Sequence, residues 1–322
     1  MRRLAEAWMA IAVLTAVTIA SDREFTHVCT IGSKQGIHPP RVLNRRATRA
    51  ALGNGENPYG LLAPVAVTTD LRGRVWITDS GTASIHVFDR SNGGYREIKR
   101  VDENALRQPS GIASDPQGRV FAADLALGGL LAFDEAGEYG RWMVRPGSDL
   151  LKGPTAIALS EDGKTIYVAD PPRDRIVALN REGEVNGSID LPPQFGEPST
   201  VSVIDNQVYV LCRRQHKVGV FSPAGRLRGE IHWDGVLFPT AFAYDPVHRW
   251  FLVADPQWMI VRGFDPDGRN LFAFGQMGEG IDQMQRVDSL YVDPQGLVYL
   301  VDSRSRKVLV FGDSRRNSAS VR

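Results

Sequence analysis

The residue types that most often carry out chemistry are sparse in this sequence and form no known catalytic pattern. Six histidines are spread along the chain, and no two of them have the spacing of a metal-binding pair. A nucleophile turn of the Gly-x-Ser-x-Gly type, a phosphate-binding loop and a Cys-His pairing are all missing. Two acids, Glu197 and Asp288, stand beside predicted strand starts and are weak candidates for metal ligands. Because a calcium ion takes about six to eight oxygen ligands, two acids alone make a thin metal site.

Arginines gather in a few predicted loops, and arginine carries paired N–H donors that match carboxylate and phosphate groups. Trp258 belongs to the same set, since an exposed indole either packs or serves in recognition. Ordinary solvated surface charge is the alternative explanation for the arginines. The candidates for a ligand-binding face are Arg173, Arg213, Arg214, His216, Trp258, Arg304 and Arg306 from loops, with Arg41, Arg45, Arg46 and Arg49 from one connecting segment.

A repeat of about 45 residues must position these side chains. Six β-rich runs end at positions that are 45, 46, 42, 43 and 47 residues apart, namely Asp79, Asp124, Asp170, Cys212, Asp255 and Asp302. Nine residues after each of them a large apolar residue closes a second run: Phe88, Phe133, Leu179, Phe221, Phe264 and Phe311. This constant spacing predicts a strand, a loop of about five residues and a returning strand in every repeat.

An earlier run in each repeat predicts an inner strand, and a later turn predicts an outer one. The earlier run opens with proline in five of six copies and is rich in small residues such as Ala66, Gly111 and Ala156. Small residues suit the innermost strand of a propeller blade, where the sheets converge on the axis. We therefore predict an all-β fold, a six-bladed β-propeller of four-stranded antiparallel blades. The sixth repeat lacks its fourth strand, and residues 25–31 are predicted to supply it and close the ring.

These motifs resemble those of the NHL-repeat family of six-bladed propellers. The resemblance is carried by the proline–small–small opening, the turn from Asp115 to Gly118, the run that ends in Ala-Asp, and the Val-x-Val-Phe run after it. It covers the chain after residue 61 and the closing strand, and it specifies architecture, not function. The resemblance implies that the loop-opening acids accept backbone hydrogen bonds and are structural: Asp79, Asp124, Asp170, Asp255 and Asp302. Cys212 departs from the family pattern in the fourth blade.

The chain divides into three parts. Residues 1–20 have the pattern of a signal peptide, with an apolar run too short for the ~20 residues that span a bilayer. Residues 21–60 hold the closing strand and a basic connecting segment, and 61–322 hold the blades and a short polar tail. A secreted or periplasmic protein with no membrane span in its mature chain is expected. Cys29 and Cys212 are predicted to lie in different blades and to stay free thiols.

A net charge of +1, with 43% hydrophobic and 23% charged residues, is ordinary for a soluble protein and gives no reason to expect a nucleic-acid partner. The sequence favours a non-catalytic binding scaffold whose loop face recognises an anionic partner, either a protein surface or an acidic glycan. No cofactor is expected. One alternative is a metal-dependent, lactonase-like propeller hydrolase or lyase with an axial site. Another is a structural subunit of an envelope complex.

Overall fold

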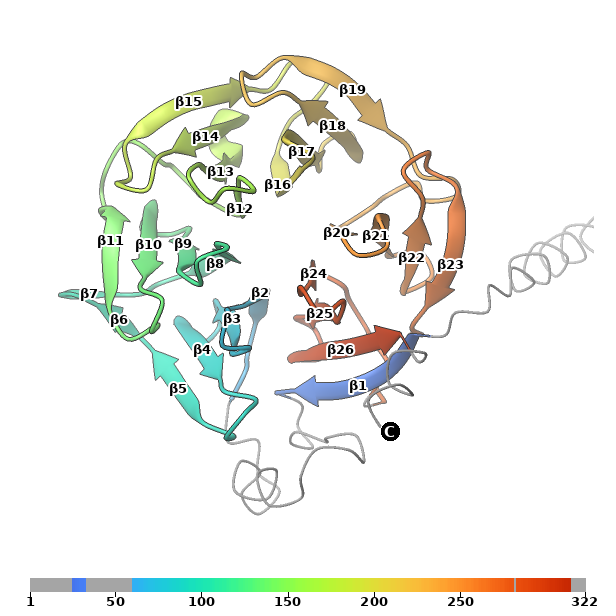
Figure 1. Ribbon diagram of the computed structural model, residues 1–322, viewed down its shortest axis with the longest axis horizontal. Helices are drawn as coiled ribbons and strands as arrows, with labels where there is room; N and C mark the ends of the chain where they lie inside the picture. Colours follow the sequence, from blue (N-terminus) through green and yellow to red (C-terminus); the bar gives the residue numbers. More distant parts are fainter. Residues whose placement is uncertain (1–24, 33–59, 281, 314–322) are drawn as a thin grey trace, which may run out of the picture.

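The computed structural model describes residues 25–32, 60–280 and 282–313. The predicted signal peptide and the segment that carries Arg41, Arg45, Arg46 and Arg49 lie outside the described residues. In the described part of the chain, six four-stranded antiparallel sheets stand radially around one axis (Figure 1). The predicted six-bladed β-propeller is confirmed.

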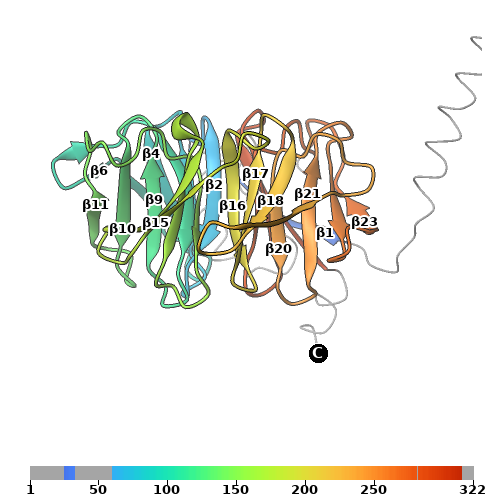
Figure 2. The ribbon, with the colours of Figure 1, turned by 90° about the horizontal axis from the view of Figure 1, so that it is seen from above.

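Each blade is a meander that runs from the axis outward, and its strands connect the two faces of a disc (Figure 2). The first blade consists of β2 (Pro64–Thr69), β3 (Val75–Asp79), β4 (Ser84–Phe88) and β5 (Tyr95–Ile98). The second consists of β8 (Pro109–Ser114), β9 (Val120–Asp124), β10 (Gly129–Phe133) and β11 (Gly140–Val144). The third consists of β12 (Ile157–Leu159), β13 (Ile166–Asp170), β14 (Arg175–Leu179) and β15 (Val185–Asp190). The fourth and fifth consist of β16 (Pro198–Ile204), β17 (Gln207–Cys212), β18 (Lys217–Phe221) and β19 (Leu227–Ile231); and β20 (Phe242–Asp245), β21 (Trp250–Asp255), β22 (Ile260–Phe264) and β23 (Asn270–Phe274).

The sixth blade is assembled from both ends of the chain. It consists of β24 (Ser289–Val292), β25 (Val298–Asp302), β26 (Lys307–Asp313) and β1 (Phe25–Ile31), in that order from the axis. β1 pairs antiparallel with β26, from Phe25 opposite Asp313 to Ile31 opposite Val308. The Phe25 ring also stacks on Phe274 of the fifth blade, with ring centroids 4.6 Å apart. Closure by the N-terminal strand is as the sequence predicts.

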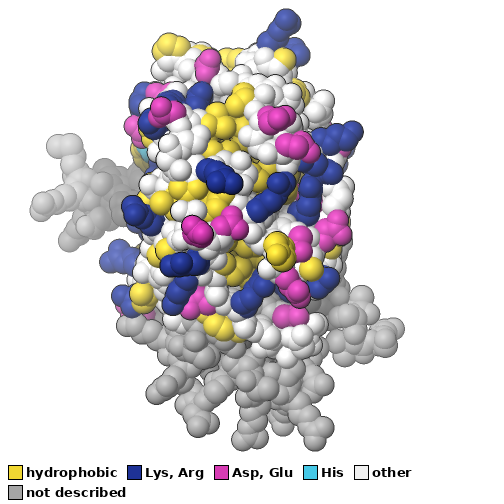
Figure 3. Space-filling model, turned by 90° about the vertical axis from the view of Figure 1, so that its left-hand side faces the viewer, with side chains coloured by type: hydrophobic (Ala, Val, Ile, Leu, Met, Phe, Trp, Pro, Cys, Tyr) yellow, Lys and Arg dark blue, Asp and Glu magenta, His cyan; other side chains and the backbone are white. Residues whose placement is uncertain are grey.

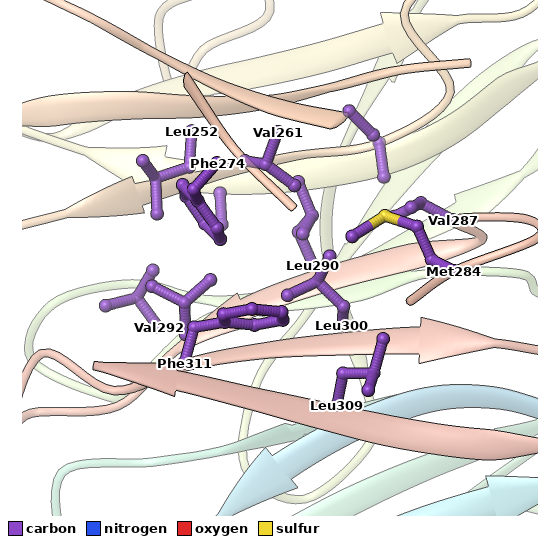
Figure 4. Close-up of a cluster of buried hydrophobic side chains, with 14 of the residues drawn as sticks. Leu252, Val261, Phe274, Met284, Val287, Leu290, Val292, Leu300, Leu309 and Phe311 are labelled. Atoms are coloured by element: carbon purple, nitrogen blue, oxygen red, sulfur yellow. The ribbon is translucent and has the colours of Figure 1, made fainter. Parts of the chain in front are cut away.

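The hydrophobic core is divided into six clusters, and each lies between two adjacent blades. Figure 4 shows the cluster between the fifth and sixth blades, where Leu252 and Phe274 face Leu290, Leu300 and Phe311. A strand inside a blade is therefore covered on both faces, and every residue of β3, β9, β13, β21 and β25 is buried. This burial explains why these strands read as continuous apolar runs in the sequence.

The structure adds details that the repeat does not predict. The inner strands β12, β20 and β24 begin two or three residues later than the openings expected from the sequence. A two-stranded ribbon, β6 (Arg100–Val101) with β7 (Asn104–Ala105), projects between the first and second blades, and Pro171–Arg173 forms a 3-10 turn. Both cysteines are free thiols, as predicted. No helix among the described residues is long and apolar enough to cross a membrane.

Candidate functional site

A channel of about 1300 Å³ follows the axis of the propeller and is lined by the inner strands. The channel exists because small residues at the inner strands let the backbones of neighbouring blades touch while leaving the axis unfilled. A Cβ added to Gly111 would come within 2.6 Å of the Ala156 Cα in the next blade, so no larger residue fits there. Small residues in the inner strands, as the sequence predicts, therefore allow the backbones of neighbouring blades to touch.

Hydroxyl groups fix the wall of this channel by linking one blade to the next. Thr78 Oγ1 donates to the Ser110 carbonyl at 2.5 Å, and Ser110 Oγ donates to the Pro154 carbonyl at 2.6 Å. Thr155 Oγ1 reaches the Pro198 carbonyl at 3.3 Å in the same way. These hydroxyls satisfy backbone acceptors of the wall, so the wall is a rigid frame and the side chains available to a ligand lie at its mouths.

One face of the disc carries the loops that begin at Asp79, Asp124, Asp170, Cys212, Asp255 and Asp302, and we call it the aspartate face. The inner strands also begin on this face, because the second strand of a blade runs antiparallel to the first. On the opposite face, the channel mouth is lined by residues such as Leu71 and Glu161. On the side of the rim that Figure 3 shows, charges are interspersed, with Lys and Arg beside Asp and Glu.

Most of the loop-opening acids bind the chain segment that enters the inner strand. Asp79 is fully buried and accepts hydrogen bonds from the backbone N–H groups of Leu62 at 2.8 Å and Ala63 at 3.0 Å. Asp124, Asp170 and Asp302 accept equivalent bonds from the segments before their own inner strands. Asp255 differs, since its carboxylate accepts from the Arg262 Nε at 2.8 Å. Buried and bonded in this way, these acids are part of the frame.

The fourth blade has Cys212 in place of this acid, and the entering segment is held by a different carboxylate. The backbone N–H of Glu197 donates to Oδ1 of Asp174, from the loop of the third blade, at 2.8 Å. The Glu197 carbonyl accepts from the Arg213 N–H at 3.0 Å. The thiol of Cys212 is a weak acceptor that is bonded by the Gly196 backbone, so the Glu197 N–H is bound by the neighbouring blade instead of its own.

This exchange places Glu197 in an unfavourable backbone conformation. Its φ is 53°, in the left-handed region, and the residue after it is Pro198. Left-handed backbone is unfavourable for a residue with a side chain, and a following proline restricts the backbone further. Among the described residues at the same place in the other blades, Ala63, Gln108 and Phe238 all have negative φ. Backbone strain of this kind costs about 1–3 kcal/mol and is concentrated at functional sites.

The left-handed conformation of Asp174 (φ 46°) has a different meaning. It falls at the fourth loop position after the strand end, where Ala83, His216, Met259 and Arg306 are also left-handed. That conformation is therefore a property of the loop in every blade. The strain at Glu197 is specific to the fourth blade.

Arg214 lies between two carboxylates at the mouth of the channel. Its Nη1 is 3.4 Å from Asp174 Oδ2, and its Nη2 is 3.4 Å from Glu197 Oε1. Half of the Arg214 and Glu197 side chains is exposed, so these ion pairs contribute little stability, but they orient the Glu197 carboxylate. Arg213 also lines the mouth; it is exposed, and no described residue forms an ion pair with its guanidinium. Among the described residues, the mouth thus presents the oriented carboxylate of Glu197 and the guanidinium of Arg213, which has no ion-pair partner there.

The other predicted face residues are more dispersed. Arg173 is tied down, with Nη1 2.7 Å from the Asp149 carbonyl and 3.6 Å from Asp170. Arg304 and Arg306 are exposed in the sixth-blade loop, and no ion pair to another described residue involves them. The face candidates of the connecting segment, Arg41, Arg45, Arg46 and Arg49, lie outside the described residues. The structure brings Arg213 and Arg214 to Glu197, which the sequence lists only as a weak metal candidate.

Phe238 and Trp258 are two exposed aromatic side chains of the aspartate face. The His216 ring meets the Phe238 ring edge-on at a centroid distance of 4.9 Å, and Phe238 is 54% exposed. Trp258, from the loop of the fifth blade, is 51% exposed. Neither His216 nor Trp258 lines the channel itself.

Comparison with known proteins gives a match in structure alone. No family model matches the chain, and no curated protein matches it. A catalytically inactive variant of virginiamycin B lyase from Staphylococcus aureus, solved with quinupristin, is similar over 91% of this chain and 96% of that chain, with a TM-score of 0.62 and 13% identity. A streptogramin B lyase structure matches with a TM-score of 0.61 and 14% identity, covering 91% of this chain and 97% of its own. The chain shares its fold with lyases.

This finding corrects the expectation of a non-catalytic binding scaffold. Two solved structures that share the architecture over 91% of the chain are lyases, which agrees better with the lyase alternative than with a non-catalytic scaffold. At 13–14% identity the likeness establishes the fold alone, so the residues that would act must be found in this chain. The sequence-based interpretation failed because a propeller site is spread over loops of several blades and has no linear motif.

The metal-dependent form of that alternative is not supported by the side chains present. Glu197 and Asp288 belong to blades four and six, and Asp288 is already bound by the Arg286 Nε at 2.6 Å and the Ser303 N–H at 3.0 Å. No group of three His, Cys, Asp or Glu side chains in the described part of the chain is arranged to hold a metal ion. We therefore derive no step through a metal.

Asp174 is the residue of the site that sequence reasoning missed. The loop contributes it as a single acid among basic residues, and nothing in its own repeat marks it. The available signal was the cysteine at position 212: where the loop-opening acid is absent, the entering segment needs another acceptor, and the preceding loop is the nearest source.

Proposed function

We propose that this protein is a lyase whose active site is the mouth of the axial channel on the aspartate face, with Glu197 as the base. The observation that carries the proposal is the conformation of Glu197, a left-handed residue before proline, held between Asp174 and Arg214. A carboxylate kept in a strained position at the rim of a channel is typical of a residue selected for its position. The fold shared with lyases supports the reaction class.

The geometry suits an elimination next to a carbonyl group. In such a reaction Glu197 takes a proton from the carbon beside the carbonyl, a carbon–carbon double bond forms, and the leaving group departs with the electron pair of its broken bond. Negative charge builds on the carbonyl oxygen, and the group that stabilises it is the guanidinium of Arg213, with which no other described residue forms an ion pair. Arg214 acts as a positioning residue, because it is paired with Glu197 and Asp174.

We propose the reaction class only, and we do not assign the substrate of the similar lyases to this protein. The inactive S. aureus variant carries alanine in place of a histidine. In this chain no histidine is among the described residues that line the channel. A carboxylate base therefore replaces an imidazole in the proposal. We also propose, on the motifs given above, that the blades are NHL-like repeats and that the protein is exported.

The proposal is tested by mass spectrometry of a panel of cyclic and linear esters, with quinupristin as one member, incubated with the purified protein. Products of elimination together have the mass of the substrate, whereas hydrolysis adds the mass of one water. We expect elimination products for at least one ester, and a loss of about 10²–10⁴-fold in rate for Glu197→Gln, the usual contribution of a general base.

Glu161→Gln is the matched control, because Glu161 is an exposed acid that lines the opposite mouth of the same channel. It should leave the rate unchanged. Hydrolysis products, equal rates for the two variants, or no turnover of any ester would contradict the proposed function.

A further inference from the structure

Exposed apolar side chains are concentrated on one sector of the aspartate face, next to the proposed active site. Leu237 is 69% exposed, Phe238 54% and Trp258 51%. Leu237 and Phe238 lie in the segment that enters the inner strand of the fifth blade, and Trp258 lies in the loop of that blade. Both segments are on the aspartate face, because inner strands begin and second strands end there. Large apolar side chains exposed together are typical of a binding surface.

One loop links the Phe238 side of this apolar sector to the channel mouth. The loop from Arg213 to His216 in the fourth blade supplies both the Arg213 guanidinium at the mouth and the imidazole whose ring centroid lies 4.9 Å from that of Phe238. A ligand whose polar group is held by Arg213 can therefore reach Phe238 along a single loop. The combination of a cation and exposed aromatic rings matches an amphiphilic ligand, since an aromatic group gains from burial against rings and an anion from the guanidinium.

We propose that the substrate is an acyl compound with a bulky aromatic group close to the reacting carbonyl, and that Leu237, Phe238 and Trp258 seat this group while Arg213 binds the acyl oxygen. The proposal rests on the proposed function in placing the reacting carbonyl at the mouth. Phe238 and Trp258 are then specificity-determining residues, which contact the substrate away from the bond that breaks. They set which substrate binds, and Glu197 sets whether it reacts.

Binding is measured without turnover by using anilinonaphthalene sulfonate, an aromatic anion whose fluorescence rises on binding. Phenylpropionate, propionate and phenylpropanol serve as competitors that carry both groups, the anion alone, and the aromatic group alone. We expect phenylpropionate to displace the dye at a concentration about tenfold or more below that of either other compound, since it uses both parts of the site. Equal potency of phenylpropionate and phenylpropanol would overturn the role of Arg213.

Variants locate the dye and separate this inference from the proposed function. The double variant Phe238→Ala, Trp258→Ala should weaken dye binding by about tenfold or more, the usual effect of losing two aromatic contacts. Arg213→Gln should weaken phenylpropionate and leave phenylpropanol unchanged. Leu71→Ala is the control, because Leu71 is 69% exposed at the opposite mouth.

Glu197→Gln should bind the dye at least as tightly as the unmodified protein does, because it removes a negative charge near Arg213 and leaves the apolar seat intact. Dye binding that is unchanged in the double aromatic variant would overturn the inference even if Glu197 proves catalytic. Dye binding that depends on Phe238 and Trp258, with no effect of Glu197→Gln on any ester, would instead leave the apolar site standing and remove the proposed function.

Discussion

Replacing Cys212 with aspartate restores the acid that opens the equivalent loop in the other blades, and it tests why Glu197 has its conformation. The Cys212 side chain is fully buried among apolar residues at the end of β17. An aspartate there would lie where Asp79 lies in the first blade, within reach of the backbone N–H groups that precede the inner strand. The Glu197 N–H would then bind its own blade and release Asp174.

The expected change in the free energy of unfolding follows from three contributions. In the first blade Asp79 accepts four backbone N–H bonds at 2.8–3.0 Å, two from the entering segment and two from its own loop. Hydrogen bonds to a charged group contribute about 1.5–3 kcal/mol each. Burial of the carboxylate costs several kcal/mol in return. The hydrogen bonds and the burial cost offset each other to a large extent, so release of the left-handed conformation sets the net stabilisation, which we expect to be about 1–3 kcal/mol.

The assay combines urea unfolding with the ester turnover measurement. Cys212→Asp should be more stable than the unmodified protein and should lose most of its activity, because Glu197 no longer points at the mouth from its strained position. Asp79→Cys is the converse control: it should cost about 2–4 kcal/mol, since buried N–H groups lose their acceptor, and should leave activity intact. A Cys212→Asp protein that is less stable and fully active would refute the account of Glu197.

Three further outcomes follow from side chains outside the site. Burial raises the pKa of both the Cys29 and the Cys212 thiol to about 11. A thiol reagent at neutral pH should therefore label neither thiol in the native protein and both after denaturation. Fewer than two labelled thiols in the denatured protein would reveal a disulfide. Burial lowers the pKa of His86 below 6.5, so the unfolded chain binds the proton more readily and stability should fall as the pH drops below about 6.5. In urea unfolding measured across that pH range, His86→Gln should reduce the dependence of stability on pH. An unchanged dependence would exclude His86 as its source. Phe25→Ala removes the ring that stacks on the fifth blade and should lower the free energy of unfolding, measured by thermal unfolding, by about 2 kcal/mol. The control Tyr139→Ala, at an 81% exposed position, should lower it by less than about 0.5 kcal/mol. Equal effects would mean that the closing strand is not held by the Phe25 ring.

The fold was predictable because its determinants are local and repeated. The distance from Asp79 to Phe88, and its copies along the chain, specify a hairpin of constant length, and six copies specify the ring. The closing strand could be predicted because the sixth repeat is incomplete and a sheet edge needs a partner.

The site was less predictable because it depends on contacts between blades. The position of Glu197 is set by Asp174, which is 23 residues earlier in the chain and belongs to another sheet. Arg173 could be expected to be free like Arg213, yet the carbonyl of Asp149 lies within its reach and holds it. Such pairings have no spacing rule within one repeat, so the sequence indicates which residues are charged but does not indicate which of them stay unpaired.

The pairing of β1 with β26 also determines when the ring of this protein can close. Thr26 and Gly312, which meet in the closing strand pair, are separated by 286 positions in the chain. During synthesis the first strand emerges long before its partner exists, and each blade can form on the one before it while the ring remains open. A chain that stops short of β26 leaves both the first strand and the last inter-blade cluster without a partner. The β1–β26 pair therefore distinguishes a closed ring from an open one, and exposed edges mark a chain truncated before β26 for aggregation or proteolysis.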